Sequence, residues 1–146
     1  MTRNQARLIH CTNLLVGGTG LVYGWMRYVA ESDDPFSIVN HPWQPDLQHA
    51  HVLCAPLLVF AVGWVWSNHV LLHWRAGSRR GRRTGIAMAI LFFPMVLSGY
   101  LLQTAVDESW RNAWIWLHGL TSAAWVLLAC VHPFLPKRMM AGKPTE

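Results

Sequence analysis

The sequence predicts an all-α integral membrane protein, a single domain over residues 1–146 that forms a bundle of four transmembrane helices. Of the 146 residues, 53% are hydrophobic and only 13% are charged. The chain also contains nine tryptophans, a residue that membrane proteins concentrate at the lipid–water boundary. Four apolar stretches are each about 20 residues or longer, enough to cross about 30 Å of hydrocarbon as a helix. They cover residues 8–30, 47–74, 84–104 and 112–134.

Each stretch is expected to be a helix, because backbone groups in lipid must find their hydrogen-bond partners within the protein. The first stretch is too long for the apolar region of a signal peptide, so we expect it to be retained. Pro56 in the second stretch and Pro94 in the third predict kinks, which membrane helices tolerate. The fourth stretch contains a histidine near each end, His118 and His132. No internal repeat is visible.

The distribution of charge predicts the orientation of the helices. Ten of the 12 lysines and arginines lie before the first stretch, between the second and third, or after the fourth. Six of the seven acidic residues lie on the opposite side, so the positive-inside rule places both termini in the cytoplasm. The net charge is +5, but the basic residues lie in short blocks between the apolar stretches. Nucleic acid is therefore not a predicted partner. The ten basic residues are Arg3, Arg7, Arg75, Arg79, Arg80, Arg82, Arg83, Lys137, Arg138 and Lys143.

The histidines indicate a cofactor. Six of the eight lie well inside the apolar stretches, and a seventh, His49, lies at the start of the second; an ionisable side chain there is costly and usually functional. His118 and His132 are 14 residues apart, so they share a helix face and are separated by about 21 Å along the axis. This spacing suits two haems stacked across the bilayer, each taking one axial imidazole from this helix and one from another. Haem iron with two axial histidines is suited to electron transfer, because both axial positions are closed to substrate.

The partner ligands follow from depth in the membrane. His118 lies near the outer end of its stretch, level with His51 in the second stretch. His49 is the alternative, but it is shallower and faces about 200° away from His51. His132 lies near the cytoplasmic end and is level with His10 in the first stretch. His69 is the alternative to His10, although it lies about 6 Å deeper toward the cytoplasm than the level of His132.

Two further histidines lie at the inner end of the second stretch. His69 and His73 are four residues apart, so an α-helix would place them on one face. They predict contacts with a quinone headgroup or with haem propionates, and Arg7 is a further candidate for the propionates. A neutral imidazole both donates and accepts a hydrogen bond, as a quinone site requires. None of the three cysteines forms a CxxCH motif, so haem would be held non-covalently.

Several motifs together resemble the prokaryotic di-haem cytochrome b family. That family includes the membrane cytochrome b subunits of formate dehydrogenases and nickel–iron hydrogenases, and superoxide oxidase. The motifs are RLIH with Asn13 and a downstream TG in the first stretch, a histidine early in the second, RRTG followed by SGYLL in the third, and LHGL followed 14 residues later by a histidine in the fourth. The resemblance implies a four-helix bundle in the bacterial inner membrane, two b haems and exchange with the quinone pool of a respiratory chain. It implies ligands at His10, His51 or His49, His118 and His132.

The favoured function is therefore electron transfer across the membrane between quinone and a periplasmic cytochrome or dehydrogenase subunit. The chain would be the electron-transfer subunit of an oxidoreductase that acts on quinol, quinone or superoxide. The alternative is a cofactor-free accessory subunit that stabilises a larger respiratory or photosynthetic complex. A metal transporter is disfavoured, because no aspartate or glutamate lies inside any apolar stretch.

Overall fold

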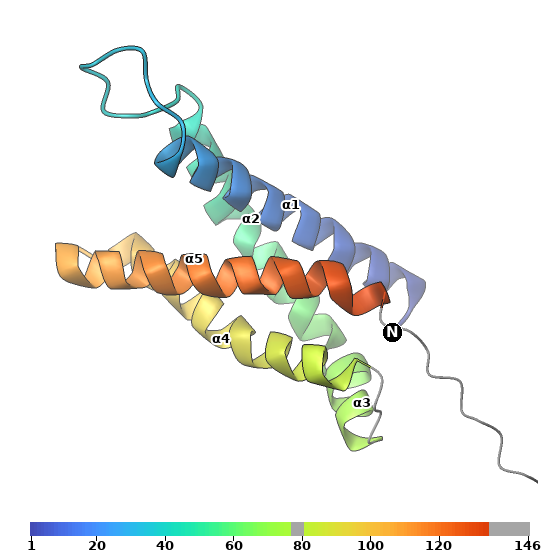
Figure 1. Ribbon diagram of the computed structural model, residues 1–146. Helices are drawn as coiled ribbons and strands as arrows, with labels where there is room; N and C mark the ends of the chain where they lie inside the picture. Colours follow the sequence, from blue (N-terminus) through green and yellow to red (C-terminus); the bar gives the residue numbers. More distant parts are fainter. Residues whose placement is uncertain (77–80, 135–146) are drawn as a thin grey trace, which may run out of the picture. The chain divides into compact units, whose positions relative to one another are not determined.

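The computed structural model describes residues 1–76 and 81–134, and every regular element within them is helical (Figure 1). The all-α prediction is confirmed. Arg79, Arg80, Lys137, Arg138 and Lys143 of the basic set lie outside the described residues. The elements are α1 (Arg3–Tyr28), α2 (Gln44–Val65), the π-helical segment η1 (Trp66–Leu71), α3 (Leu72–Arg75), α4 (Arg82–Thr104), α5 (Glu108–Val131) and the short 3₁₀ segment η2 (His132–Phe134).

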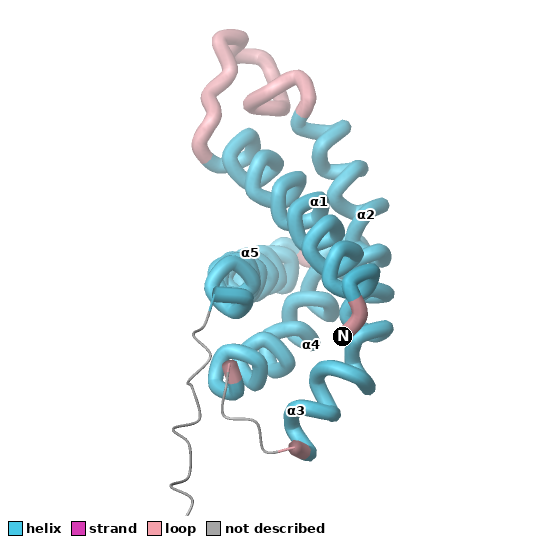
Figure 2. Tube along the Cα trace, turned by 90° about the vertical axis from the view of Figure 1, so that its right-hand side faces the viewer, coloured by secondary structure: helices cyan, strands magenta, loops and turns pink. Residues whose placement is uncertain are grey.

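The helices form two compact units, Met1–Leu71 and Leu72–Glu146. In the first unit, α1 packs against α2, and the two are joined by the loop 29–43 (Figure 2). In the second unit, α4 packs against α5, and the short connection 105–107 joins the two helices. Each unit is therefore an antiparallel helical hairpin, and we refer to them as the first and second hairpins.

Polar residues define where α1 begins. Thr2 caps the helix by accepting a hydrogen bond from the backbone N–H of Gln5 at 3.2 Å, and the Gln5 side chain accepts one from the N–H of Thr2 at 2.9 Å. This reciprocal pair satisfies two donors that a helix start would otherwise leave unpaired. The helix consequently starts at Arg3, five residues before the apolar stretch that predicted it.

The second apolar stretch forms one continuous helix, Gln44–Arg75, whose hydrogen bonding changes partway. From Trp66 to Leu71 the segment is π-helical, with bonds from residue i to residue i+5 instead of i+4. Each turn of this segment therefore takes in an additional residue. Spacings that hold in an α-helix do not carry across it.

In the second hairpin, a side chain caps the start of α5, and aromatic rings pack between α4 and α5. Asp107 caps α5 by accepting a hydrogen bond from the N–H of Trp110 at 3.0 Å. Phe92 on α4 and Trp125 on α5 pack with ring centroids 5.6 Å apart, and Trp125 is only 4% exposed. Trp125 is therefore a packing residue of this hairpin.

Three helices within the described residues are long and apolar enough to cross a membrane: Gln44–Arg75, Arg82–Thr104 and Glu108–Phe134. A multi-pass membrane protein is therefore indicated. Helix α1 is long enough at 26 residues, but its apolar residues are diluted by His10, Thr12, Asn13 and several glycines. The prediction of four spans with both termini in the cytoplasm stays a prediction.

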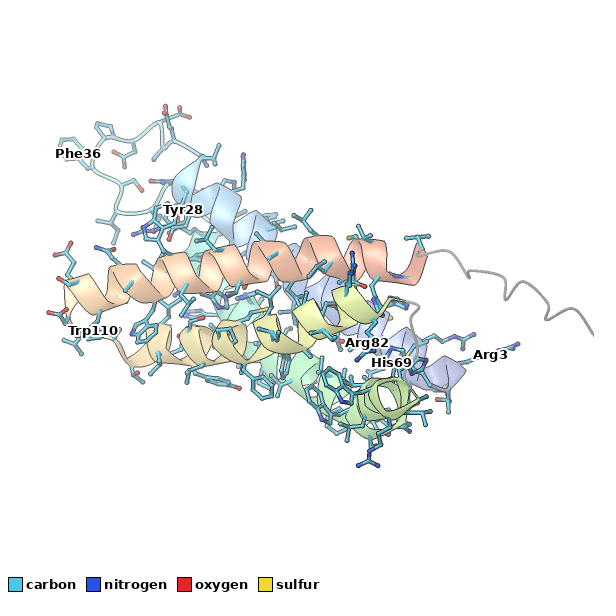
Figure 3. The ribbon with its side chains drawn as sticks, turned by 60° about the horizontal axis from the view of Figure 1, so that its bottom comes forward. Arg3, Tyr28, Phe36, His69, Arg82 and Trp110 are labelled. Carbon is cyan, nitrogen blue, oxygen red and sulfur yellow. The ribbon has the colours of Figure 1, made fainter. Side chains whose placement is uncertain are left out.

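Aromatic side chains gather at the loop end of each hairpin. Arg3 and Tyr28 mark the two ends of α1, and Phe36 projects from the loop that follows (Figure 3). Tyr28 is 63% exposed and Trp110, at the start of α5, is 62% exposed. Exposed aromatic rings at one end of a membrane helix are typical of the lipid–water boundary.

Candidate functional site

The ring of His51 on α2 lies directly against α1 in the first hairpin. Its Nδ1 is 3.1 Å from the carbonyl oxygen of Val16 and 3.3 Å from Oγ1 of Thr19. Because a carbonyl oxygen only accepts, Nδ1 carries a hydrogen and donates it to Val16. A Cβ added to Gly20 would lie 2.8 Å from Cε1 of His51, closer than real Cβ atoms approach. The glycine therefore makes the room that the ring occupies.

The second hairpin repeats this arrangement around His118 on α5. Its Nδ1 is 2.9 Å from the carbonyl oxygen of Met95 and 3.5 Å from Oγ of Ser98, both on α4. A Cβ added to Gly99 would lie 3.0 Å from Cε1 of His118. Ser122, one turn further along α5, places Oγ 3.4 Å from Nε2 of His118.

We call each arrangement of carbonyl, hydroxyl and glycine a histidine notch. Both notches have the same spacing on the first helix of their hairpin, with the carbonyl at position i, the hydroxyl at i+3 and the glycine at i+4. The hydroxyls donate their own hydrogens one turn back, Thr19 to Leu15 at 2.8 Å and Ser98 to Pro94 at 2.6 Å. Their lone pairs are thus available to Nδ1. The notch residues are Val16, Thr19 and Gly20 on α1 and Met95, Ser98 and Gly99 on α4.

The sequence contains these notches only in part. The TG and SG pairs stand out as motifs, but the hydroxyl and carbonyl contacts depend on how the two helices of a hairpin are aligned. The signal that could have found them is the repeated pairing of a small hydroxyl residue with glycine, once before each of the histidines His51 and His118.

His132, at the start of η2, is held at the other end of the second hairpin. Oγ1 of Thr84 lies 2.8 Å from its Nδ1, and a Cβ added to Gly85 would lie 3.6 Å from its Cε1. Thr84 donates its own hydrogen to the carbonyl oxygen of Gly81 at 3.0 Å. Gly81, Thr84 and Gly85 again have the spacing i, i+3 and i+4, and we call this the third histidine notch. It differs from the other two, because the carbonyl oxygen of Gly81 accepts from Thr84 and Gly85 and the contact with the ring is made by the hydroxyl. The ring of His132 contacts the hydroxyl of Thr84, and a Cβ at Gly85 would make only an ordinary van der Waals contact with it.

The carbonyl contacts of the first two notches select one tautomer of the imidazoles of His51 and His118. With its hydrogen on Nδ1, a neutral imidazole carries its lone pair on Nε2. Histidines that bind metals usually donate the other ring N–H to a carbonyl or a similar acceptor, which fixes the tautomer and the ring orientation. His51 and His118 therefore have the outer hydrogen bond that is usual for a histidine binding a metal through Nε2.

The structure distinguishes His49 from His51. His49 is exposed, whereas His51 is partly buried in its notch on α1. This contrast favours His51 as the functional histidine of α2. His10 is exposed on α1, and Arg7 is exposed one turn before it.

His69 and His73 do not form the simple pair that an α-helix would give. His69 lies inside η1 and is partly buried, and His73 lies in α3 and is exposed. Because η1 is π-helical, the inference that His69 and His73 share a face loses its geometric basis. The two histidines also belong to different units.

An open apolar hollow of about 520 Å³ lies on α1 beside the first notch. Its lining residues are Cys11, Leu14, Leu15 and Thr19, so one side of it reaches the hydroxyl that contacts His51. Ligand sites of this size are typically apolar with few polar groups.

Among residues 1–76 and 81–134, no group of three or more histidines, cysteines or acidic residues could hold a metal ion. The ligands that the notches offer are single imidazoles. Comparisons of the chain with protein-family models, with curated proteins and with solved structures found no match.

Proposed function

We propose that the chain is a di-haem b-type cytochrome that carries electrons across a bacterial cytoplasmic membrane, between quinone and a periplasmic redox partner. The observation that carries the proposal is the repetition of the histidine notch. The two hairpins hold His51 and His118 by the same three groups, and in each the Nδ1–H of the histidine donates to a backbone carbonyl oxygen. A histidine with only a packing role does not require this repeated arrangement.

The residues fit haem iron through the chemistry of these donors. Each haem needs two axial imidazoles, and a notch provides one with the metal-binding tautomer. From the depth of each residue in its own helix, His51 and His118 are assigned to the outer haem. His10 and His132 are assigned to the inner haem by the same criterion.

Charged and small residues support the assignment. Arg7 precedes His10 in α1, and Arg27 and Arg111 lie near the loop ends of the hairpins. Each could neutralise a haem propionate. The glycines of the notches allow the imidazoles to approach the neighbouring helix closely. The absence of a CxxCH motif from the sequence makes the attachment non-covalent.

A bound haem supplies a one-electron carrier whose potential depends on its axial ligands, their hydrogen bonds and the polarity around it. The protein's own contribution is to hold the imidazoles in one tautomer and to surround them with apolar helices. We assign the electron exchange with quinone to the cytoplasmic end of the Gln44–Arg75 helix, where either His69 or His73 is a candidate to bond a quinone carbonyl.

The proposal is tested by a reduced-minus-oxidised optical spectrum of the purified full-length chain, followed by addition of a quinol to the oxidised protein. We expect a b-type spectrum and reduction by quinol, with slower reduction in a His69→Ala, His73→Ala double variant that keeps both haems. A His41→Ala variant is the matched control, because His41 lies in the loop 29–43 beside Trp43.

The possible contradictions are distinct. A protein without a haem spectrum would contradict the proposal and favour the cofactor-free accessory subunit. Haem that quinol does not reduce would contradict the quinone part alone. Unchanged reduction in the double variant would move the quinone site away from His69 and His73.

A further inference from the structure

The three notches differ in what accepts the Nδ1 hydrogen. At His51 and His118 the shortest contact is to a backbone carbonyl, at 3.1 and 2.9 Å, and the hydroxyl lies further away, at 3.3 and 3.5 Å. At His132 the contact is to the side-chain hydroxyl of Thr84, at 2.8 Å. A carbonyl contact survives any side-chain substitution, whereas the Thr84 contact does not.

The start of α4 holds the Thr84 hydroxyl in one orientation. Gly81 precedes the helix in the left-handed conformation, with φ of 61°, and no side chain caps the helix there. Its carbonyl oxygen accepts the backbone N–H of Gly85 at 2.8 Å and the hydroxyl hydrogen of Thr84 at 3.0 Å. When Thr84 donates its hydrogen to Gly81, the hydroxyl oxygen can accept the Nδ1 hydrogen of His132.

We propose that Thr84 is a positioning residue for His132, accepting its Nδ1 hydrogen and thereby setting how strongly Nε2 donates electrons to the inner haem iron. The inference rests on the proposed function and adds to it a residue, Thr84, that sets the reduction potential of one of the two haems. Hydrogen bonds to the outer nitrogen of a metal-binding histidine raise its basicity and fix its orientation. A more basic ligand stabilises ferric iron, so the Thr84 contact lowers the reduction potential of the haem.

The test is a spectroscopic redox titration of the full-length chain carrying Thr84→Val, which keeps the shape of the side chain and removes the acceptor. We expect two haems to be retained and the potential of one to rise. The expected change is up to about tenfold in the equilibrium between oxidation states, which corresponds to about 59 mV for a one-electron couple. Electron paramagnetic resonance of the ferric protein should show one altered low-spin signal. Thr84→Ser keeps a hydroxyl and should restore both readouts.

Two controls separate this role from general destabilisation. Thr121 is buried on α5 and donates its hydroxyl hydrogen to the backbone carbonyl oxygens of Leu117 and His118, so Thr121→Val should leave the inner haem unchanged. Ser98→Ala removes a hydroxyl but keeps the 2.9 Å carbonyl contact to His118, so its effect should be smaller than that of Thr84→Val.

The outcomes distinguish the two proposals. A wild-type chain without haem would overturn the proposed function and this inference together. A chain with two haems whose Thr84→Val variant has unchanged potentials and signals would overturn the inference alone. Equal shifts in Thr84→Val and Thr84→Ser would also overturn it, because the hydroxyl would then not be responsible.

Discussion

The two hairpins hold a histidine in the same way near their loop ends and differ at their other ends. In the first hairpin, His51 occupies a notch on α1, and in the second, His118 occupies a notch with identical spacing on α4. The second hairpin has a further notch, for His132. The histidine of the first hairpin assigned to the same depth, His10, is exposed on α1.

This difference ranks the proposed ligands by the support that each has. The outer pair, His51 and His118, combines matched depth with matched local geometry. In the inner pair, His10 and His132 have matched depth, but only His132 lies in a notch. The comparison also separates the two histidines of the second hairpin: a carbonyl holds His118 on α5, and a hydroxyl holds His132 at the start of η2.

The largest expected effect is the loss of the outer haem. We expect His118→Ala and His51→Ala each to lower the haem content from about two to about one per chain, because each removes an axial ligand. His49→Ala is the matched control, since His49 is exposed two residues from His51, and it should keep both haems. Haem content is measured as the pyridine haemochrome. Loss of haem from His49→Ala but not from His51→Ala would reverse the assignment.

The next effect concerns the inner haem, where the two hairpins differ. We expect His132→Ala and His10→Ala to lose the same haem, identified by the potential that disappears from the redox titration. His69→Ala should keep it. If His69→Ala instead matches His132→Ala while His10→Ala retains both haems, the first hairpin would contribute its inner ligand from the Gln44–Arg75 helix.

A smaller effect is expected from the glycines of the notches. Gly20→Ala and Gly99→Ala would place a Cβ 2.8 and 3.0 Å from a ring atom of His51 and His118, so each ring must shift. We expect haem affinity at the outer site to fall by about 10- to 100-fold, as for other changes around metal-binding histidines. Haem retention during dilution in detergent would measure this. Equal retention in wild type and both variants would contradict the notch geometry.

Matched glycines sharpen this test. Gly24 on α1 and Gly119 on α5 would have no atom within 4 Å of an added Cβ, so alanine there should keep both haems and favour the helix by up to about 1 kcal/mol. Gly85→Ala should have the smallest effect of the notch variants, because its Cβ would lie 3.6 Å from His132, an ordinary contact. A loss at Gly24 or Gly119 equal to that at Gly20 would contradict the account.

The helices were predictable because long apolar stretches have one stable form in lipid. The start of α1 was missed by five residues, since the Thr2–Gln5 capping pair is polar and hydropathy does not detect it. The π-helical segment Trp66–Leu71 was not predictable from apolar spacing, because it is a change in hydrogen-bond pattern and not in residue type.

The candidate site was predictable at the level of which histidines to consider. Helix spacing alone pairs His118 with His132 on one face. Depth and helix face already favoured His51 over His49, and the hairpin adds a direct reason, because Val16 and Gly20 on α1 lie against the ring of His51. Contacts between helices depend on this register, which a single sequence does not specify.

The most direct test of the central claim is the number of haems in the purified wild-type chain. The pyridine haemochrome assay gives the haem concentration, and quantitative amino-acid analysis gives the protein concentration. The account predicts about two non-covalent b haems per chain, because four depth-matched histidines form two axial pairs. A ratio near one would contradict the di-haem assignment, and a ratio near zero would contradict the cytochrome altogether.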